Sequence, residues 1–219
     1  MVAGTPATDF TGDFETHFTV PAPRPGDEER IRHWAERNGL KYTRIVLDRG
    51  ATPDQPMLTV RGRGALPAQR AAAARWTGRL RAEGIGVARV KIEAAPWNTG
   101  VPRTRGQARA LPPGCYFEHH VKLVIADPVR LDEVRAIAGR HAAHVSRNAR
   151  RDLGDRGHER FVTQRCRDVG RPEARQRLDR LLADLTQAGL TAVEVEEEFV
   201  VHDDRPALDD GWIDEAQAR

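Results

Sequence analysis

The sequence predicts an α+β fold made by tandem duplication of a ferredoxin-like (βαββαβ) unit, with antiparallel sheets and helices on one face. The first observation is the order of the periodic segments. Alternating apolar residues mark strands, amphipathic stretches ending at glycine mark helices, and the same order occurs twice. The second observation is that landmark residues recur 103 to 105 positions apart. These pairs are His17 and His120, Thr59 and Thr163, and Gly84 and Gly189.

Each unit is expected to contain four strands and two helices. In the first unit the strands are predicted at 14–20, 42–48, 56–63 and 85–93, and the helices at 26–39 and 67–83. In the second unit the strands are predicted at 116–125, 144–149, 159–167 and 190–200, and the helices at 128–143 and 171–188. Right-handed crossovers then place the first strand of each unit between the third and fourth, antiparallel to both.

The domain boundaries follow from changes in composition. Residues 1–98 are the first repeat, and 114–203 are the second. Residues 99–113, rich in Pro, Gly and Arg, are expected to link them. Residues 204–219 form an acidic C-terminal tail in which Trp212 is expected to dock on the body, and a protein partner bound through this tail is the alternative.

Composition limits the class of partner. The 35 Lys and Arg residues face 32 Asp and Glu, giving a net charge of +3, so nonspecific nucleic-acid binding is not expected. No apolar run is long enough for a membrane span, and the first residues lack the order of a signal peptide. We therefore expect a cytoplasmic protein.

Alternation along the strands assigns polar side chains to one face of each sheet. In the strand 14–20, Phe14 and Phe18 face the helices, so Glu15, His17 and Thr19 project from the open face. The same parity in the second unit places another Glu-X-His-X set on the open face of 116–125. This second set is Glu118, His120 and Lys122.

Neighbouring strands add further charges to these open faces. By parity they present Arg61, Arg63, Lys91, Glu93, Thr163 and Arg165. If the two open faces meet, these side chains line a polar cleft in which Arg and Lys hold an anion while His17 and His120 transfer protons. The alternative is that they are solvated sheet faces joined by cross-strand ion pairs.

The stretch "HFTV", His17 to Val20, resembles the His-hydrophobic-Thr-hydrophobic signature of 2H phosphoesterases. That resemblance implies two histidines that act as acid and base on a 2′,3′-cyclic or 2′–5′ phosphodiester, with Thr19 holding the phosphate. The second copy, "HVKL", carries Lys122 where that family has Thr or Ser.

The stretch "EHHVK", Glu118 to Lys122, is similar to the Glu-X-Glu-X-Lys motif of the CYTH triphosphate-tunnel family, with His120 in place of the second Glu. In such a tunnel, the acidic strand "EVEEE" would suit metal binding. A metal site is also open from the residues themselves, because His17 with Glu15 or Glu93 could supply ligands. A His–Glu pair across the sheet is favoured over a metal, and no cofactor is specified.

These observations predict a protein that binds a phosphate-bearing small molecule or nucleotide in a Glu/His/Arg cleft between the repeats. Hydrolysis or transfer of that ligand, in the manner of a phosphoesterase, is the accompanying hypothesis, with His17 and His120 as the catalytic pair. The alternative is a non-catalytic module that binds a ligand or a protein through the same surface.

Overall fold

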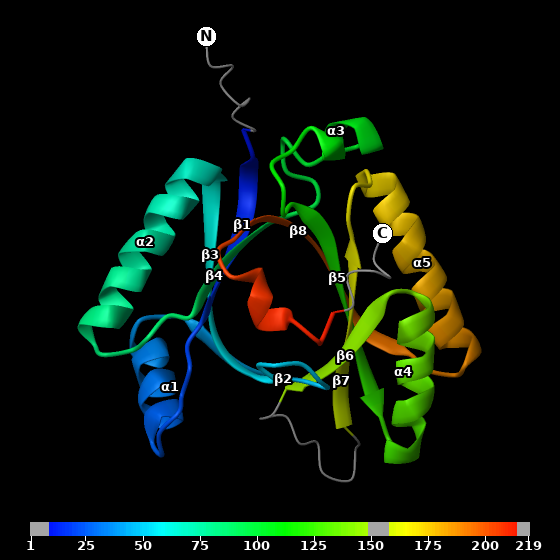
Figure 1. The fold of residues 1–219 in the computed structure, drawn as a ribbon, viewed down its shortest axis with the longest axis horizontal. Helices are drawn as coiled ribbons and strands as arrows, with labels where there is room; N and C mark the ends of the chain where they lie inside the picture. Colours follow the sequence, from blue (N-terminus) through cyan, green and yellow to red (C-terminus); the bar gives the residue numbers. More distant parts are fainter. Residues whose placement is uncertain (1–8, 149–157, 214–219) are drawn as a thin grey trace.

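Two βαββαβ units form one closed antiparallel barrel in the computed structural model, which describes residues 9–148 and 158–213 (Figure 1). The first unit comprises β1 (Thr11–Thr19), α1 (Asp27–Arg37), β2 (Lys41–Leu47), β3 (Asp54–Ala65), α2 (Leu66–Ala82) and β4 (Arg89–Ala94). The second comprises β5 (Tyr116–Ile125), α4 (Leu131–Arg140), β6 (Ala143–Asn148), β7 (His158–Cys166), α5 (Arg171–Gln187) and β8 (Ala192–Asp203). The α+β class and the ferredoxin-like order of elements are confirmed.

Short elements connect and flank the two units. The segment predicted as a linker contains a short helix, α3 (Arg105–Arg109), whose first turn is capped by the Thr104 hydroxyl. A 3₁₀ turn, η1 (Pro128–Arg130), precedes α4, and another, η3 (Pro206–Asp209), follows β8. Among the described residues, no helix is long and apolar enough to cross a membrane.

The predicted strand order within each unit is confirmed. Strand β1 pairs antiparallel with β3 and β4, and β5 pairs in the same way with β7 and β8. The register sets Glu15 opposite Glu93, and Glu118 opposite Glu198. The first halves of β1 and β5 therefore have equivalent partners on β4 and β8.

Closure of the barrel differs from the predicted cleft, in which two separate sheets would pack face to face. Instead, the sheets join edge to edge, because β4 pairs with β8 and β2 pairs with β6. Each unit alone has two edge strands with unpaired backbone N–H and C=O groups, and these pairings satisfy them. Both polar faces consequently line the inside of one barrel within one chain.

Sequence parity explains which side faces the helices. On β1, Phe14 and Phe18 are buried under the helices, which lie outside the ring of strands in Figure 1. Phe117 on β5 and Phe199 on β8 lie with ring centroids 4.6 Å apart and pack into the apolar layer of the first unit. A second apolar layer lies under α4 and α5. The apolar core therefore surrounds the barrel, and the interior is left to polar side chains.

The repeated glycines end equivalent helices. Gly84 and Gly189 follow α2 and α5 with φ of 67° and 70°, a left-handed conformation that suits glycine. Behind Gly84, the backbone N–H of Ile85 donates to the carbonyl of Leu80, which continues the helix-ending turn. Strand β4 therefore begins at Arg89 and not at residue 85, where the sequence pattern placed it.

His119 is a polar residue on the helix-facing, apolar side of β5. It lies on the helix side, fully buried, with Nδ1 3.1 Å from Gln164 Oε1 and no hydrogen-bond partner for Nε2 among the described residues. Burial lowers the pKa of His119, so folding is opposed once the unfolded chain binds a proton there. The lowered pKa of buried His119 therefore has no effect on the free energy of unfolding above about pH 6.5, and it reduces that free energy as the pH falls below this value.

We expect His119→Leu to reduce the acid sensitivity of the fold. Between pH 7 and pH 5 the variant should lose less free energy of unfolding than the wild type, because it lacks the buried imidazole whose pKa is lowered in the fold. Urea unfolding at each pH measures the difference. Parallel pH profiles for the two proteins would contradict this assignment.

Candidate functional site

The barrel encloses a cavity of about 500 Å³, lined by side chains from all of the described strands. This is within the usual range for small-molecule sites. Ten of the residues predicted for the site from the sequence line it. They are Glu15, His17, Thr19, Lys91, Glu93, Glu118, His120, Lys122, Thr163 and Arg165.

His17 is held at both ring nitrogens. Its Nδ1 lies 2.8 Å from the Thr59 hydroxyl on β3, and its Nε2 lies 2.6 Å from Glu93 Oε2 on β4. One residue from each strand that pairs with β1 therefore holds the imidazole ring, and the ring lies in the wall of the cavity. Glu93 is buried, so the pair is shielded from water.

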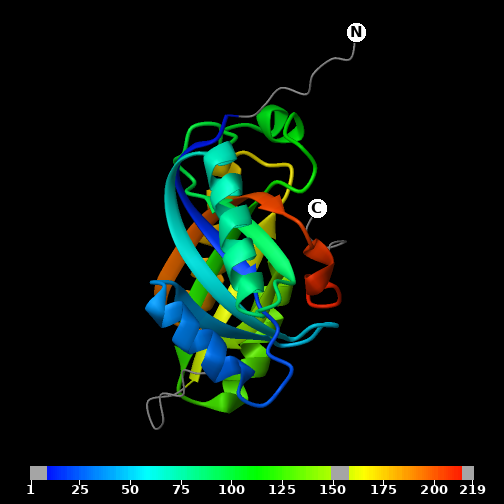
Figure 2. The same cartoon turned by 90° about the vertical axis from the view of Figure 1, so that its left-hand side faces the viewer.

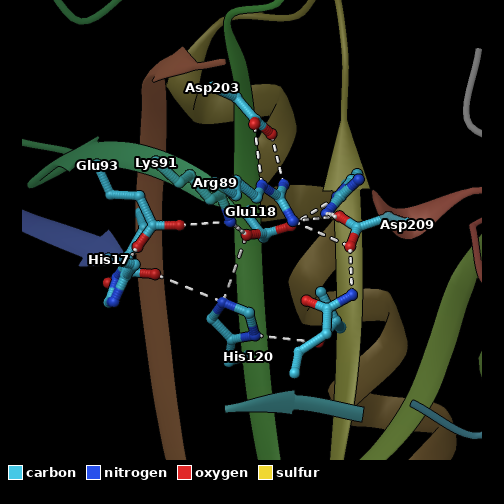
Figure 3. A network of polar contacts seen from close by, with 12 residues as sticks. His17, Arg89, Lys91, Glu93, Glu118, His120, Asp203 and Asp209 are labelled. Atoms are coloured by element: carbon cyan, nitrogen blue, oxygen red, sulfur yellow. Dashed lines mark hydrogen bonds and ion pairs between the residues drawn. The ribbon is translucent and has the colours of Figure 1, made fainter. Parts of the chain in front are cut away.

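His120 repeats this arrangement in the second unit. Its Nδ1 lies 3.0 Å from the Thr163 hydroxyl on β7, and its Nε2 lies 3.4 Å from Glu198 on β8 and 3.6 Å from Glu118. The two histidines thus face one shared cavity, each with a hydroxyl on one nitrogen and carboxylate on the other (Figure 3).

The carboxylates around both rings favour the protonated form of each histidine. Burial alone would lower the pKa of His17, but the charge and hydrogen bond of Glu93 raise it above the ordinary value. Burial acts in the same direction on His120, whose bonds to Glu118 and Glu198 nevertheless raise the pKa to about 10. When protonated, each Nδ1–H donates to its threonine hydroxyl.

Glu198 behaves differently from the other buried carboxylates. Burial raises the pKa of Glu198 to about 7, and the nearby charge of Glu93 adds to this effect, whereas His120 and His17 oppose it. Lys91 contributes to keeping Glu93 ionised, and the pKa of Glu93 lies well below its ordinary value despite burial. Glu198 is therefore the carboxyl of the cavity that can exchange a proton near neutral pH.

A chain of alternating charges connects the histidines to the end of the barrel (Figure 3). The Lys91 ammonium lies 2.5 Å from Glu93 and also contacts Glu118. Glu118 accepts in turn from Arg165 Nε at 2.6 Å. Burial would neutralise these groups, but their opposite neighbours keep Glu118 ionised and Lys91 and Arg165 protonated.

The segment after β8 covers one mouth of the barrel. In Figure 1, η3 lies across the centre of the ring, and Figure 2 shows it on one side of the strands. Asp209 accepts from Arg89 Nη1 at 3.0 and 3.1 Å and from Arg165 Nη2 at 2.6 Å. Trp212 is buried beside it, and its indole N–H donates to the carbonyl of Val145 at 3.0 Å. Docking of Trp212 thus occurs as expected, and use of the tail by a protein partner stays a prediction.

Two predicted anion-binding residues lie outside the cavity. The side chains of Arg61 and Arg63 are 81% and 84% exposed, and Arg61 Nε donates to Glu15 at 2.7 Å. Thr59 is the last β3 residue that lines the cavity, and the strand continues past it toward α2. The long arginine side chains therefore extend into solvent at the rim, and their assignment to the site is corrected.

The predicted set of site residues left out several charged side chains that line the cavity, among them Arg89, Glu198 and Asp209. Arg89 has the same parity as Lys91 on β4, so alternation alone was sufficient to include it. Asp209 belongs to no periodic element, and no local pattern indicates that it folds back over the barrel. The lining residues of β2 and β6 were missed because they reach the cavity only through edge pairing. They include Lys41, Thr43, Ser146 and Asn148.

Two groups of side chains have donor atoms spaced for a divalent cation, all within 4.8 Å of one another. They are Glu15, His17 and Glu198, and Glu93, Glu118 and His120. In the second group the Lys91 ammonium already lies against both carboxylates, so it would repel a cation. In the first group Glu15 accepts from Arg61 at the rim and both ring nitrogens of His17 already have partners, so a cation there would have to displace the proton and hydrogen bonds of His17.

Comparison with known proteins identifies no family. No protein-family model matches the sequence, and no curated protein matches it either. Among solved structures, the small subunit of acetolactate synthase from Thermotoga maritima is 12% identical, with a TM-score of 0.30 over 86% of this chain and 94% of that chain. The regulatory subunit of aspartate kinase from Thermus thermophilus is 11% identical, with a TM-score of 0.34 over 84% and 93%. A mutant chlorite dismutase from Candidatus Nitrospira defluvii is 12% identical, with a TM-score of 0.28 over 95% and 96%. TM-scores this low carry no argument about what the barrel binds.

We expect the Asp209 carboxylate to contribute strongly to stability. Asp209→Asn keeps the shape of the side chain but leaves two buried guanidinium groups short of one negative charge. The free energy of unfolding should fall by about 3 kcal/mol, as measured by urea unfolding at pH 7. The matched control is Asp210→Asn at the adjacent, exposed position, for which we expect no more than about 0.5 kcal/mol. Equal effects of the two substitutions would contradict the proposed role of Asp209.

Proposed function

We propose that the barrel binds a phosphate-bearing small molecule or nucleotide and transfers protons on it through His17, His120 and Glu198. The observation that carries this proposal is the meeting of two imidazoles, each against a carboxylate that raises its pKa, and one carboxyl with a pKa of about 7 in a single cavity. Groups whose pKa values are driven apart by their surroundings are the usual means of acid–base catalysis at neutral pH.

The net charge of the cavity lining is compatible with binding of a phosphate group when both histidines are protonated. Among the described lining residues, eight carboxylates face five Lys and Arg side chains. Protonation of His17 and His120 brings the cationic groups to seven, and a protonated Glu198 leaves seven carboxylates. The lining is then close to neutral and no longer repels an anion, and a phosphate group would be held by its direct contacts with Lys, Arg and protonated His side chains.

The roles follow from the protonation states. Glu198, with a pKa of about 7, is suited to accept the proton of an attacking hydroxyl or water. His120, protonated over the physiological range, is suited to donate to the leaving oxygen. His17 lines the same cavity and is suited to donate a second proton, and Thr19, on the same strand, is suited to bind a phosphoryl oxygen.

The two sequence resemblances suggest different probes. The 2H resemblance favours a 2′,3′-cyclic nucleotide between two histidines. The closed barrel, with Glu194, Glu196 and Glu198 of the acidic strand inside it, is also consistent with the triphosphate-tunnel resemblance. We therefore choose 2′,3′-cyclic AMP and inorganic tripolyphosphate as the two probes, each tested with Mn²⁺ and with EDTA because His17 and Glu198 could also hold a cation.

We expect the wild type to hydrolyse one of these probes with a bell-shaped dependence of kcat/KM on pH. The rate should rise with pH through about 7 as Glu198 loses its proton, and fall toward pH 10 as His120 loses its own. In Glu198→Gln the rising limb should disappear and kcat should fall by about 100-fold or more. His120→Ala should show a similar loss of kcat while calorimetry still detects binding.

Glu197→Gln is the matched control for this experiment. Glu197 is adjacent to Glu198 but points to the opposite face of β8, where it pairs with Arg175 at 2.8 Å. Its substitution should leave kcat and the pH profile unchanged. Binding of a probe with no turnover would identify a non-catalytic binding module, and absence of both would reject the proposal.

A further inference from the structure

We infer that Arg89 and Arg165 form an anion-binding subsite of the cavity that Asp209 occupies in place of a ligand phosphate. The inference rests on the proposed function only for the identity of the anion. The subsite itself is defined by contacts within the chain, between the two arginines and Asp209.

The two guanidinium groups converge on one carboxylate. Arg89 Nη1 lies 3.0 and 3.1 Å from the two oxygens of Asp209, and Arg165 Nη2 lies 2.6 Å from one of them. The side chains of all three residues are 4 to 6% exposed, so the contact is desolvated. A carboxylate held by convergent arginines in a dry site has the same recognition chemistry as a bound phosphate oxygen pair.

The arginines are positioned independently of Asp209. Arg89 Nε donates to Asp203 on β8 at 2.9 Å, and Arg165 Nε donates to Glu118 on β5 at 2.6 Å. Arg165 also stacks over the ring of Tyr116, with its guanidinium carbon 5.0 Å from the centroid. The subsite therefore keeps its shape when Asp209 leaves, and each guanidinium retains unused N–H donors for an incoming anion.

Asp209 is held by a segment that is not a strand of the barrel. This segment, residues 204–213, is attached to the barrel by separate contacts. Gln55 Nε2 donates to the carbonyl of Leu208 at 3.3 Å, and the Trp212 indole N–H donates to the carbonyl of Val145. Two backbone bonds add to these, from Ala51 N to the carbonyl of Asp210 at 3.0 Å and from Asp204 N to the carbonyl of Val90 at 3.2 Å. Release of this segment breaks no strand pairing between named strands, so a ligand can exchange with Asp209 without opening the barrel.

The test is the affinity of the full chain for inorganic tripolyphosphate, measured by isothermal titration calorimetry at pH 7. In the wild type the anion competes with an internal carboxylate, which reduces its apparent affinity. Asp209→Asn keeps a side chain of the same shape without the charge, so we expect binding at least about tenfold tighter than in the wild type. Tripolyphosphate should also raise the Tm of this variant more than that of the wild type.

Three further proteins make the result decisive. Asp210→Asn, at the exposed neighbouring position, should bind as the wild type does. Adding Arg89→Gln to Asp209→Asn should remove the gain. If Asp209→Asn does not fold, Trp212→Ala loosens the segment. This variant also removes the contact of the indole ring with the Arg165 guanidinium at 5.9 Å, but Arg165 keeps its hydrogen bond to Glu118 and its stacking on Tyr116, so the variant should also bind more tightly.

The inference is overturned if folded Asp209→Asn or Trp212→Ala binds tripolyphosphate no more tightly than the wild type, or if the gain survives Arg89→Gln. This outcome is distinct from failure of the proposed function, which is measured as turnover dependent on His120 and Glu198. The gain in affinity should also persist when His120→Ala is combined with Asp209→Asn.

Discussion

Closure of the sheet through the β4–β8 and β2–β6 edges is the constraint on which the rest of the structure depends. It satisfies the edge strands and at the same time turns two polar sheet faces into the wall of one chamber. Charges that would be solvated on an open sheet are buried there, and each must find a partner. The ordered sequence of ion pairs from Glu93 to Asp209 is the result of that requirement.

The sequence was sufficient for everything that depends on local periodicity. Alternation along β1 and β5 placed His17 and His120 on the polar face, and the repeated order of elements defined the strand order of each unit. It could not predict closure, because edge pairing depends on backbone groups that leave no signature in side-chain type. The exposed position of Arg61 and the inward position of Asp209 follow from closure and from the path of the chain beyond β8, and neither has a local pattern.

The two histidine sites are alike in design but not in charge. Both use a threonine on the third strand of the unit and a glutamate on the fourth. Lys91 stands beside Glu93, however, whereas among the described residues Glu198 has no lysine or arginine within ion-pair distance. Lys91, together with the close hydrogen bond from His17, holds the pKa of Glu93 well below its usual range, whereas burial raises that of Glu198 to about 7, so a nearly symmetric barrel has an asymmetric centre.

The edge pairing also limits what half of the barrel can be. A lone βαββαβ unit would present two unpaired edges and a face of glutamate and histidine with half of its partners missing. Glu118, for example, pairs with Arg165 of its own unit and also with Lys91 of the other unit, and Lys91 in turn pairs with Glu93 of its own unit. Among the described lining residues, the strands of the first unit supply two carboxylates and three Lys or Arg side chains, and those of the second supply five carboxylates and two. A separated half that paired with a second copy of itself would therefore not reproduce the charge of this ring.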